Sequence, residues 1–232
     1  KEALEEMGID LNVVLFNNEI YGLTKGQYSP TSKLGKITKT SPYGTVERPF
    51  NPGELVIGAH GTFFARSIDA EVNLTTECMV AASKHDGLSV IEVLVNCMIF
   101  NNGTHKAFAG DKEVRAEHTI TLRQGEKMLF GKNMDKGLML DNMKLKVVTV
   151  GENGVTLDDI LVHDAHEKDT MVHVMLASMK YPDFPVALGI IRDVAEPTYE
   201  REVARQIAEV QATAKIKNVD DLLNSGETWE VE

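Results

Sequence analysis

The sequence predicts an α/β fold in which a parallel sheet is flanked by helices and is incomplete at its N-terminal end. Two short apolar runs, Val13 to Phe16 and Leu88 to Val95, are bounded by turn formers, which is typical of strands buried on both faces. Residues 62–95 follow the order strand, helix, strand, and this spacing indicates a βαβ unit with parallel strands. We therefore expect a ligand site where the carboxyl ends of these strands meet.

Length and composition exclude several classes of protein. The 232 residues can bury a large core, and 43% hydrophobic with 25% charged residues is ordinary for a globular protein. The net charge of -11 argues against nucleic-acid binding, which needs clustered Lys and Arg. No run approaches the roughly 18 apolar residues of a membrane span. Two cysteines make no disulfide framework, so we expect a reducing, cytoplasmic setting.

The first half of the chain supplies most of the expected sheet. Residues 1–10 read as the end of a helix that stops at Gly8 and leads into the first strand, so we expect the chain to be the later part of a larger subunit. Residues 32–51 have no regular period and read as a long surface loop. The remaining elements expected here are a short helix from Pro52 to Ile57, a strand at 62–66, a helix from Asn73 or Thr75 to Lys84, and the strand that begins at Leu88.

The second half has a looser pattern. We expect irregular excursions over residues 103–159, with a hairpin at 151–154, because Gly, Lys and Asn are frequent there. An apolar helix around 171–179, a strand at 185–191, a helix at 198–214 and a final short helix with a tail should follow. Accordingly, residues 1–102 are expected to be the later half of an α/β domain, and residues 103–232 an extension whose C-terminal helices pack on that same domain.

The stretch NNEIYGLTKGQ, which begins at Asn17, follows the first apolar run directly. Asn17 and Asn18 offer neutral oxygen ligands at a strand end, and Gly22 and Gly26 let the backbone turn with its N–H groups inward. Such oxygens beside donors suit a magnesium ion that carries phosphate oxygens. An Asn- and Gly-rich turn that only reverses the chain is the alternative, and the residues alone leave both readings open.

Other groups of residues give weaker evidence for a functional site. His163, Asp164, His166 and His173 lie close in sequence, but no further residue completes a recognised zinc spacing, so we expect a surface or interface role. Cys78 falls on an amphipathic helix, where a buried inert thiol is the ordinary state. There is no nucleophile elbow and no P-loop.

Five segments resemble the β subunits of the 2-oxoacid:ferredoxin oxidoreductases, and the later ones are most similar to the bacterial 2-oxoglutarate branch. The segments are NNEIYGLTKGQYSPTS from Asn17, LVNCMIFNNGTH at 94–105, FGKNMDKGLML at 130–140, ILVHD at 160–164 and LLNSGETWEV at 222–231. The resemblance covers the chain from about Leu11. It implies that residues 1–102 belong to the thiamine diphosphate-binding domain of that family.

The resemblance also implies roles for individual residues. The side chain of Asn18 and the backbone carbonyl of Ile20 match ligands of the magnesium of thiamine diphosphate, beside an Asp from an upstream motif that has no counterpart here. Gly22, Leu23 and Thr24 match the loop that passes the cofactor and its diphosphate. Cys97 matches the fourth ligand of a 4Fe-4S cluster. On physical grounds, Lys25 would lie close enough to the cofactor for its positive charge to favour a carboxylate substrate or an anionic intermediate.

The implied reaction is the oxidative decarboxylation of a 2-oxoacid with coenzyme A and ferredoxin. The partner would be an α subunit, which contributes coenzyme A binding and much of the substrate pocket, so that this chain alone would be inert. Within the same class of enzyme, pyruvate or a branched-chain 2-oxoacid is the alternative substrate to 2-oxoglutarate. From another class, the alternative is a non-catalytic assembly module, against which the presence of Asn18, Thr24, Lys25 and Cys97 argues.

Overall fold

The computed structural model describes residues 11–227 and 229, and these fall into two units. One unit holds the described residues up to 195, and the other holds the described residues from 196 onward; each is described by itself. The expected helix over residues 1–10, with its stop at Gly8, lies outside the described residues.

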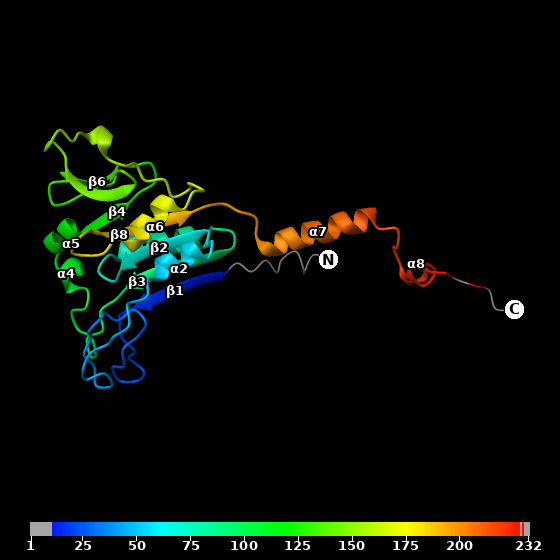
Figure 1. Ribbon diagram of the computed structural model, residues 1–232, viewed down its shortest axis with the longest axis horizontal. Helices are drawn as coiled ribbons and strands as arrows, with labels where there is room; N and C mark the ends of the chain where they lie inside the picture. Colours follow the sequence, from blue (N-terminus) through cyan, green and yellow to red (C-terminus); the bar gives the residue numbers. More distant parts are fainter. Residues whose placement is uncertain (1–10, 228, 230–232) are drawn as a thin grey trace. The chain divides into compact units, whose positions relative to one another are not determined.

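A five-stranded sheet forms the centre of the larger unit, in the order β1, β3, β2, β8, β4 (Figure 1). Its strands are β1 (Leu11–Asn17), β2 (Phe63–Ile68), β3 (Leu88–Leu94), β4 (Thr119–Leu122) and β8 (Val186–Asp193). β1, β3 and β2 run parallel, so the expected βαβ unit is confirmed. β8 runs antiparallel to β2 and parallel to β4, so the sheet is only mainly parallel.

Helices cover both faces of this sheet. α3 (Val72–Ala82) packs on one face, where Cys78 and Ala82 meet Phe63, Ala65 and Ile91. α2 (Pro52–Gly58) and α6 (Met171–Ser178) lie together against the other face. The α2 helix begins as expected, because the Asn51 side chain accepts hydrogen bonds from the first-turn N–H groups and Pro52 needs no such partner. The predicted α/β class is thus confirmed.

β1 differs from the expectation in its burial. The run Val13 to Phe16 was expected to be buried on both faces, but Val13 is 39% exposed, Leu15 37% and Phe16 63%. The reason is its place in the sheet: among the described residues it pairs only with β3, whereas β3 lies between two strands and is buried from Ser89 to Leu94. An apolar run therefore identified the strand but not its position in the sheet.

Residues 103–159 are more regular than expected. They hold β4, two short helices, and a second sheet in which three strands are antiparallel. These elements are α4 (Lys106–Ala109), α5 (Lys112–His118), β5 (Leu129–Phe130), β6 (Lys136–Asp141), β7 (Lys144–Thr149) and a 3-10 turn, η1 (Leu157–Asp159). The chain does turn at 151–154, where the Gly151 N–H donates to the Val155 carbonyl at 2.8 Å, but the paired strands β6 and β7 of the hairpin turn at Asn142 and Met143, both with positive φ.

The division at residue 102 stays a prediction, although β4 and β8, which follow it, share a sheet with β1 to β3. The smaller unit contains α7 (Tyr199–Thr213), capped by Thr198, and α8 (Val219–Leu223).

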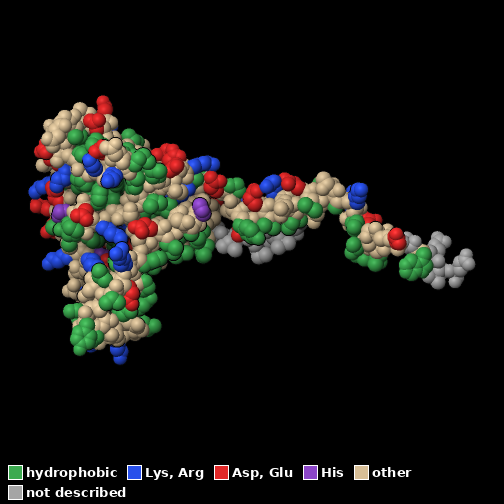
Figure 2. Space-filling model, in the orientation of Figure 1, with side chains coloured by type: hydrophobic (Ala, Val, Ile, Leu, Met, Phe, Trp, Pro, Cys, Tyr) green, Lys and Arg blue, Asp and Glu red, His purple; other side chains and the backbone are tan. Residues whose placement is uncertain are grey.

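Within the described residues, no helix combines the length and the apolar character needed to cross a bilayer. On the face seen in Figure 2, acidic and basic side chains are interspersed rather than gathered into one basic patch.

Candidate cofactor site at the carboxyl end of the sheet

The polar stretch after β1 forms a tight, well-anchored turn. The Asn17 side-chain oxygen accepts from the Glu19 N–H at 3.2 Å, and that of Asn18 accepts from the Ile20 N–H at 3.1 Å. Such bonds to the backbone two residues on are typical of Asx turns. From outside the turn, Asn101 donates its amide to the Asn18 carbonyl at 2.9 Å, and Ser32 donates its hydroxyl to the Glu19 carbonyl at 2.6 Å. The turn is therefore held by segments far away in the sequence.

Two oxygen atoms of this turn fit a metal ion. The Asn18 side-chain oxygen accepts one hydrogen bond and keeps a second lone pair. No hydrogen bond from a described residue reaches the Ile20 carbonyl, while the Ile20 side chain is buried and fixes the backbone there. Two neutral oxygens suit magnesium only together with other ligands, since the described residues offer no cluster of three His, Cys, Asp or Glu. The fit is thus partial and needs anionic oxygens from a diphosphate or another segment.

The loop after this turn closes on itself and faces solvent. Tyr21 and Gln27 pair across its neck, and Lys25 takes the left-handed conformation with a φ of 62°. Leu23 is 98% exposed, and Thr24 and Lys25 are exposed as well. In the described part of the chain, these side chains therefore line no closed pocket.

Cys97 lies in a turn that follows β3 and contacts the same loop. The turn is closed by the Asn101 N–H, which donates to the Cys97 carbonyl at 3.0 Å. A methyl group added at Gly26 would lie 3.2 Å from the Phe100 ring, so the two loops are in close contact. Cys78, in contrast, lies on the buried face of α3, and burial raises the pKa of its thiol to about 12. The described residues thus offer one accessible thiol, which alone does not fit a 4Fe-4S cluster.

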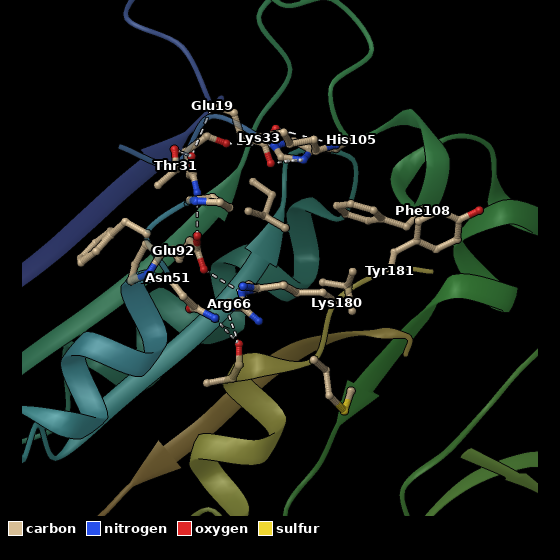
Figure 3. A pocket seen from close by; sticks show the side chains of 18 of the residues that line it. Glu19, Thr31, Lys33, Asn51, Arg66, Glu92, His105, Phe108, Lys180 and Tyr181 are labelled. Atoms are coloured by element: carbon tan, nitrogen blue, oxygen red, sulfur yellow. Dashed lines mark hydrogen bonds and ion pairs between the residues drawn. The ribbon is translucent and has the colours of Figure 1, made fainter. Parts of the chain in front are cut away.

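A pocket of about 290 Å³ lies beside the Asx turn, on the face of the sheet covered by α2 and α6 (Figure 3). Asn17 and Glu19 line it, whereas Asn18 does not. At its floor, Arg66 of β2 pairs with Glu92 of β3 at 2.7 Å, and both side chains are buried. The sequence signal for this pair is a single charged residue within each largely apolar strand, FFARSI and LSVIEVL, which does not by itself indicate that the two residues meet.

Two of the three histidines in this group, His163 and His173, are buried, so the expected surface role was wrong for them, whereas His166 is exposed. His163 and His173 are each 1% exposed. They hydrogen-bond the carbonyls of Ile190 and Asp164 at 2.8 Å, and Arg192 donates to the other nitrogen of His173. Burial lowers the pKa of both imidazoles. They are core residues that join the extension to β8, and the described residues near them form no metal-binding group.

Comparison with known proteins agrees with this geometry. The family model described as "Thiamine pyrophosphate enzyme, C-terminal TPP binding domain" matches residues 2–93, which include β1, β2, all but the last residue of β3, and the turn between Asn17 and Ile20. The 2-oxoglutarate oxidoreductase subunit KorB of Mycobacterium tuberculosis is 37% identical over 97% of this chain. The chain is related to the β subunits of 2-oxoacid:ferredoxin oxidoreductases. The resemblance expected from the five sequence segments is therefore confirmed.

Other 2-oxoacid:ferredoxin oxidoreductase subunits match over shorter stretches. The 2-oxoacid:ferredoxin oxidoreductase subunit beta of Saccharolobus solfataricus is 44% identical over 40% of this chain and 31% of its own length. The chain spans 60% of the length of the M. tuberculosis subunit. A structure of 2-oxoglutarate:ferredoxin oxidoreductase from Magnetococcus marinus, with 2-oxoglutarate, coenzyme A and succinyl-CoA bound, superposes with a TM-score of 0.62 at 20% identity. That superposition covers 98% of this chain and 62% of the other, and it supports the fold.

Proposed function

We propose that this chain is part of the thiamine diphosphate-binding β subunit of a 2-oxoglutarate:ferredoxin oxidoreductase, which acts with an α subunit. The observation that carries the proposal is the Asx turn at the carboxyl end of β1, where the Asn18 side-chain oxygen and the Ile20 carbonyl are both able to bind a metal. This is the edge at which α/β folds bind cofactors. The family match over residues 2–93 includes this turn.

In the proposed site, the turn at Asn18 to Ile20 and the loop from Gly22 to Lys25 bind the cofactor and the substrate. Asn18 and Ile20 hold the magnesium that carries the diphosphate, with Gly22, Leu23 and Thr24 passing beside it. When bound, thiamine diphosphate supplies an electron sink for the decarboxylation of a 2-oxoacid. Lys25 binds the carboxylate of the substrate, and its ammonium group is free of ion pairs with described residues.

In the complete subunit, Cys97 would be one ligand of a 4Fe-4S cluster, and such a cluster would supply the one-electron chemistry needed to reduce ferredoxin. The support is the contact of Phe100, in the Cys97 turn, with Gly26 of the cofactor loop, which puts the two proposed sites side by side. The other thiolates must come from outside the described chain, since Cys78 is buried and its raised pKa keeps it protonated. A cytoplasmic location fits such oxidation-sensitive chemistry.

The loop over residues 21–50 supports the need for a partner. It exposes apolar side chains that a lone subunit would leave in water, among them Leu23, Leu34, Ile37, Tyr43 and Val46. Exposed apolar surface of this kind marks interaction sites. We assign this surface to the α subunit, which would also bring coenzyme A and much of the substrate pocket.

The test is Asn18→Leu in the complete β subunit assembled with its α subunit. Losing one metal ligand should weaken binding of magnesium thiamine diphosphate by about 10- to 100-fold in calorimetric titration. Asn133→Leu, the same change at an exposed loop position, is the control and should leave the affinity as in the wild type. Equal affinity of both variants would refute the assignment, and a wild-type complex that turns over pyruvate or branched-chain 2-oxoacids instead would correct the substrate.

A further inference from the structure

Two side chains of opposite charge are buried on the inner strands β2 and β3 of the sheet. Arg66 and Glu92 stand directly opposite each other on β2 and β3, and they are 5% and 2% exposed. The Arg66 Nε donates to one Glu92 carboxylate oxygen at 2.7 Å, and its guanidinium also reaches the Ala177 carbonyl at 3.2 Å. Desolvation of a buried ion pair offsets most of its attraction, so stability alone is a weak reason for the pair.

The second carboxylate oxygen of Glu92 points to the strand that carries the proposed site. It accepts a hydrogen bond from the Asn17 side-chain N–H at 2.7 Å. A carboxylate only accepts hydrogen bonds, whereas an amide has a donating and an accepting end. Glu92 therefore fixes which way the Asn17 amide is turned: its nitrogen faces Glu92 and its oxygen faces the turn.

The side-chain oxygen of Asn17, oriented in this way, stabilises the Asx turn after β1. It accepts from the Glu19 N–H at 3.2 Å and from the Thr31 hydroxyl at 2.7 Å. The Asn17 carbonyl is held as well, by His105 Nε2 at 3.0 Å. The next residues along the chain are Asn18 and Ile20, the proposed magnesium ligands.

We propose that Glu92, itself held by Arg66, is a positioning residue for the cofactor metal. Through the Asn17 amide it fixes the backbone from Asn17 to Ile20, so that the two metal-binding oxygens are pre-oriented. The inference rests on the proposed function, because it assigns a role toward the magnesium of that site. If the Asn17 amide were free to flip, its nitrogen would face the Glu19 N–H, and the two donors would repel each other and open the turn.

The first test uses a matched pair of isosteric changes in the complete β subunit assembled with its partner. Thr31→Val removes the hydroxyl that bonds Asn17 at 2.7 Å, and Thr62→Val removes one that bonds His85 at 2.9 Å, at the opposite end of the sheet. Both should shift the unfolding midpoint by similar amounts. Only Thr31→Val should weaken binding of magnesium thiamine diphosphate, by about tenfold, as is usual when a group that orients a metal ligand is lost.

The second test addresses the charge pair. Glu92→Gln should weaken the binding of magnesium thiamine diphosphate by at least tenfold, because Arg66 then takes the single glutamine oxygen and the glutamine NH2 is left facing the Asn17 amide nitrogen. The double variant Glu92→Gln with Arg66→Met also removes the guanidinium that donates to residue 92. The glutamine oxygen can then accept from the Asn17 amide, so the affinity for magnesium thiamine diphosphate should largely recover. Unchanged affinity in Thr31→Val, or no recovery in a folded double variant, would overturn the proposal. A wild-type complex without affinity for thiamine diphosphate would instead refute the proposed function.

Discussion

At the scale of single residues, the end of β1 shows how polar side chains build a rigid turn where an apolar strand stops. Asn17 is 8% exposed and makes three side-chain hydrogen bonds, to Glu92, Glu19 and Thr31. A buried amide is stable only when its polar atoms are paired, and here each pairing also fixes a backbone direction. The conformation of Asn18 and Ile20 is thus set by their neighbours before any ligand arrives.

Lys25 offers a prediction at this scale. In the assembled enzyme, Lys25→Met should lower kcat/KM for the 2-oxoacid by roughly 10- to 100-fold, because a hydrogen bond to a charged group contributes about 1.5–3 kcal/mol. Lys84→Met, at an exposed lysine that follows α3, is the control. Steady-state kinetics would measure the difference, and wild-type values for Lys25→Met would make this lysine an ordinary surface charge.

Cys97 carries a second prediction for a single residue. In the full-length subunit, Cys97→Ala should abolish or badly destabilise the electron paramagnetic resonance signal of the reduced cluster, since such clusters normally take four Cys thiolates. Cys78→Ala is the matched control, because that thiol is buried in the core and should affect stability but not the signal. Iron content and signal at wild-type levels in Cys97→Ala would show that Cys97 binds no iron.

At the scale of elements, buried histidines join the second half of the chain to the main sheet. His163 lies between the second sheet and β8, and its Nε2 donates to the Ile190 carbonyl at 2.8 Å. Its other ring nitrogen is buried without a hydrogen-bond partner among the described residues. Protonating this second nitrogen would bury a positive charge away from water. Burial therefore lowers the pKa of His163.

The buried His163 should therefore make the free energy of unfolding depend on pH. In the unfolded chain His163 has its ordinary pKa of 6.5, whereas in the folded protein the pKa is lower. Below about pH 6.5 the unfolded state binds more protons, so the free energy of unfolding should fall as the pH falls. Urea titrations at pH 7.5, 6.5 and 5.5 would measure this fall. It should be smaller in His163→Gln, which keeps a donor for Ile190, and an equally steep fall in that variant would contradict the explanation.

At the scale of the whole molecule, the cysteine count limits what the chain can hold. The 232 residues contain two cysteines, and a 4Fe-4S cluster normally takes four. Anaerobic reconstitution of this chain with iron and sulfide should therefore give well below one cluster per chain, as measured by iron content and visible absorbance. The complete subunit, treated in parallel, is the positive control. A full cluster on this chain alone would show that ligands other than thiolates complete the site.

The sequence by itself determined much of the local structure. The apolar runs identified β1 and β3, the Asn-Pro pair identified the start of α2, and the polar stretch after β1 was correctly placed at a strand end. These features depend on neighbouring residues and on periodicities of two or 3.6, which a single sequence displays directly. The motif around Asn18 also indicated the family, because many of its residues are adjacent in the chain.

Only the tertiary structure decided which distant residues meet. Glu92 and Asn17 are 75 positions apart, yet one hydrogen bond between them orients the proposed metal site. The edge position of β1, the reversed direction of β8 and the burial of His163 and His173 depend likewise on strand order and packing. The physical reason is that hydrogen bonding and burial act between neighbours in space, and a local pattern in the sequence does not record which partners the fold brings together.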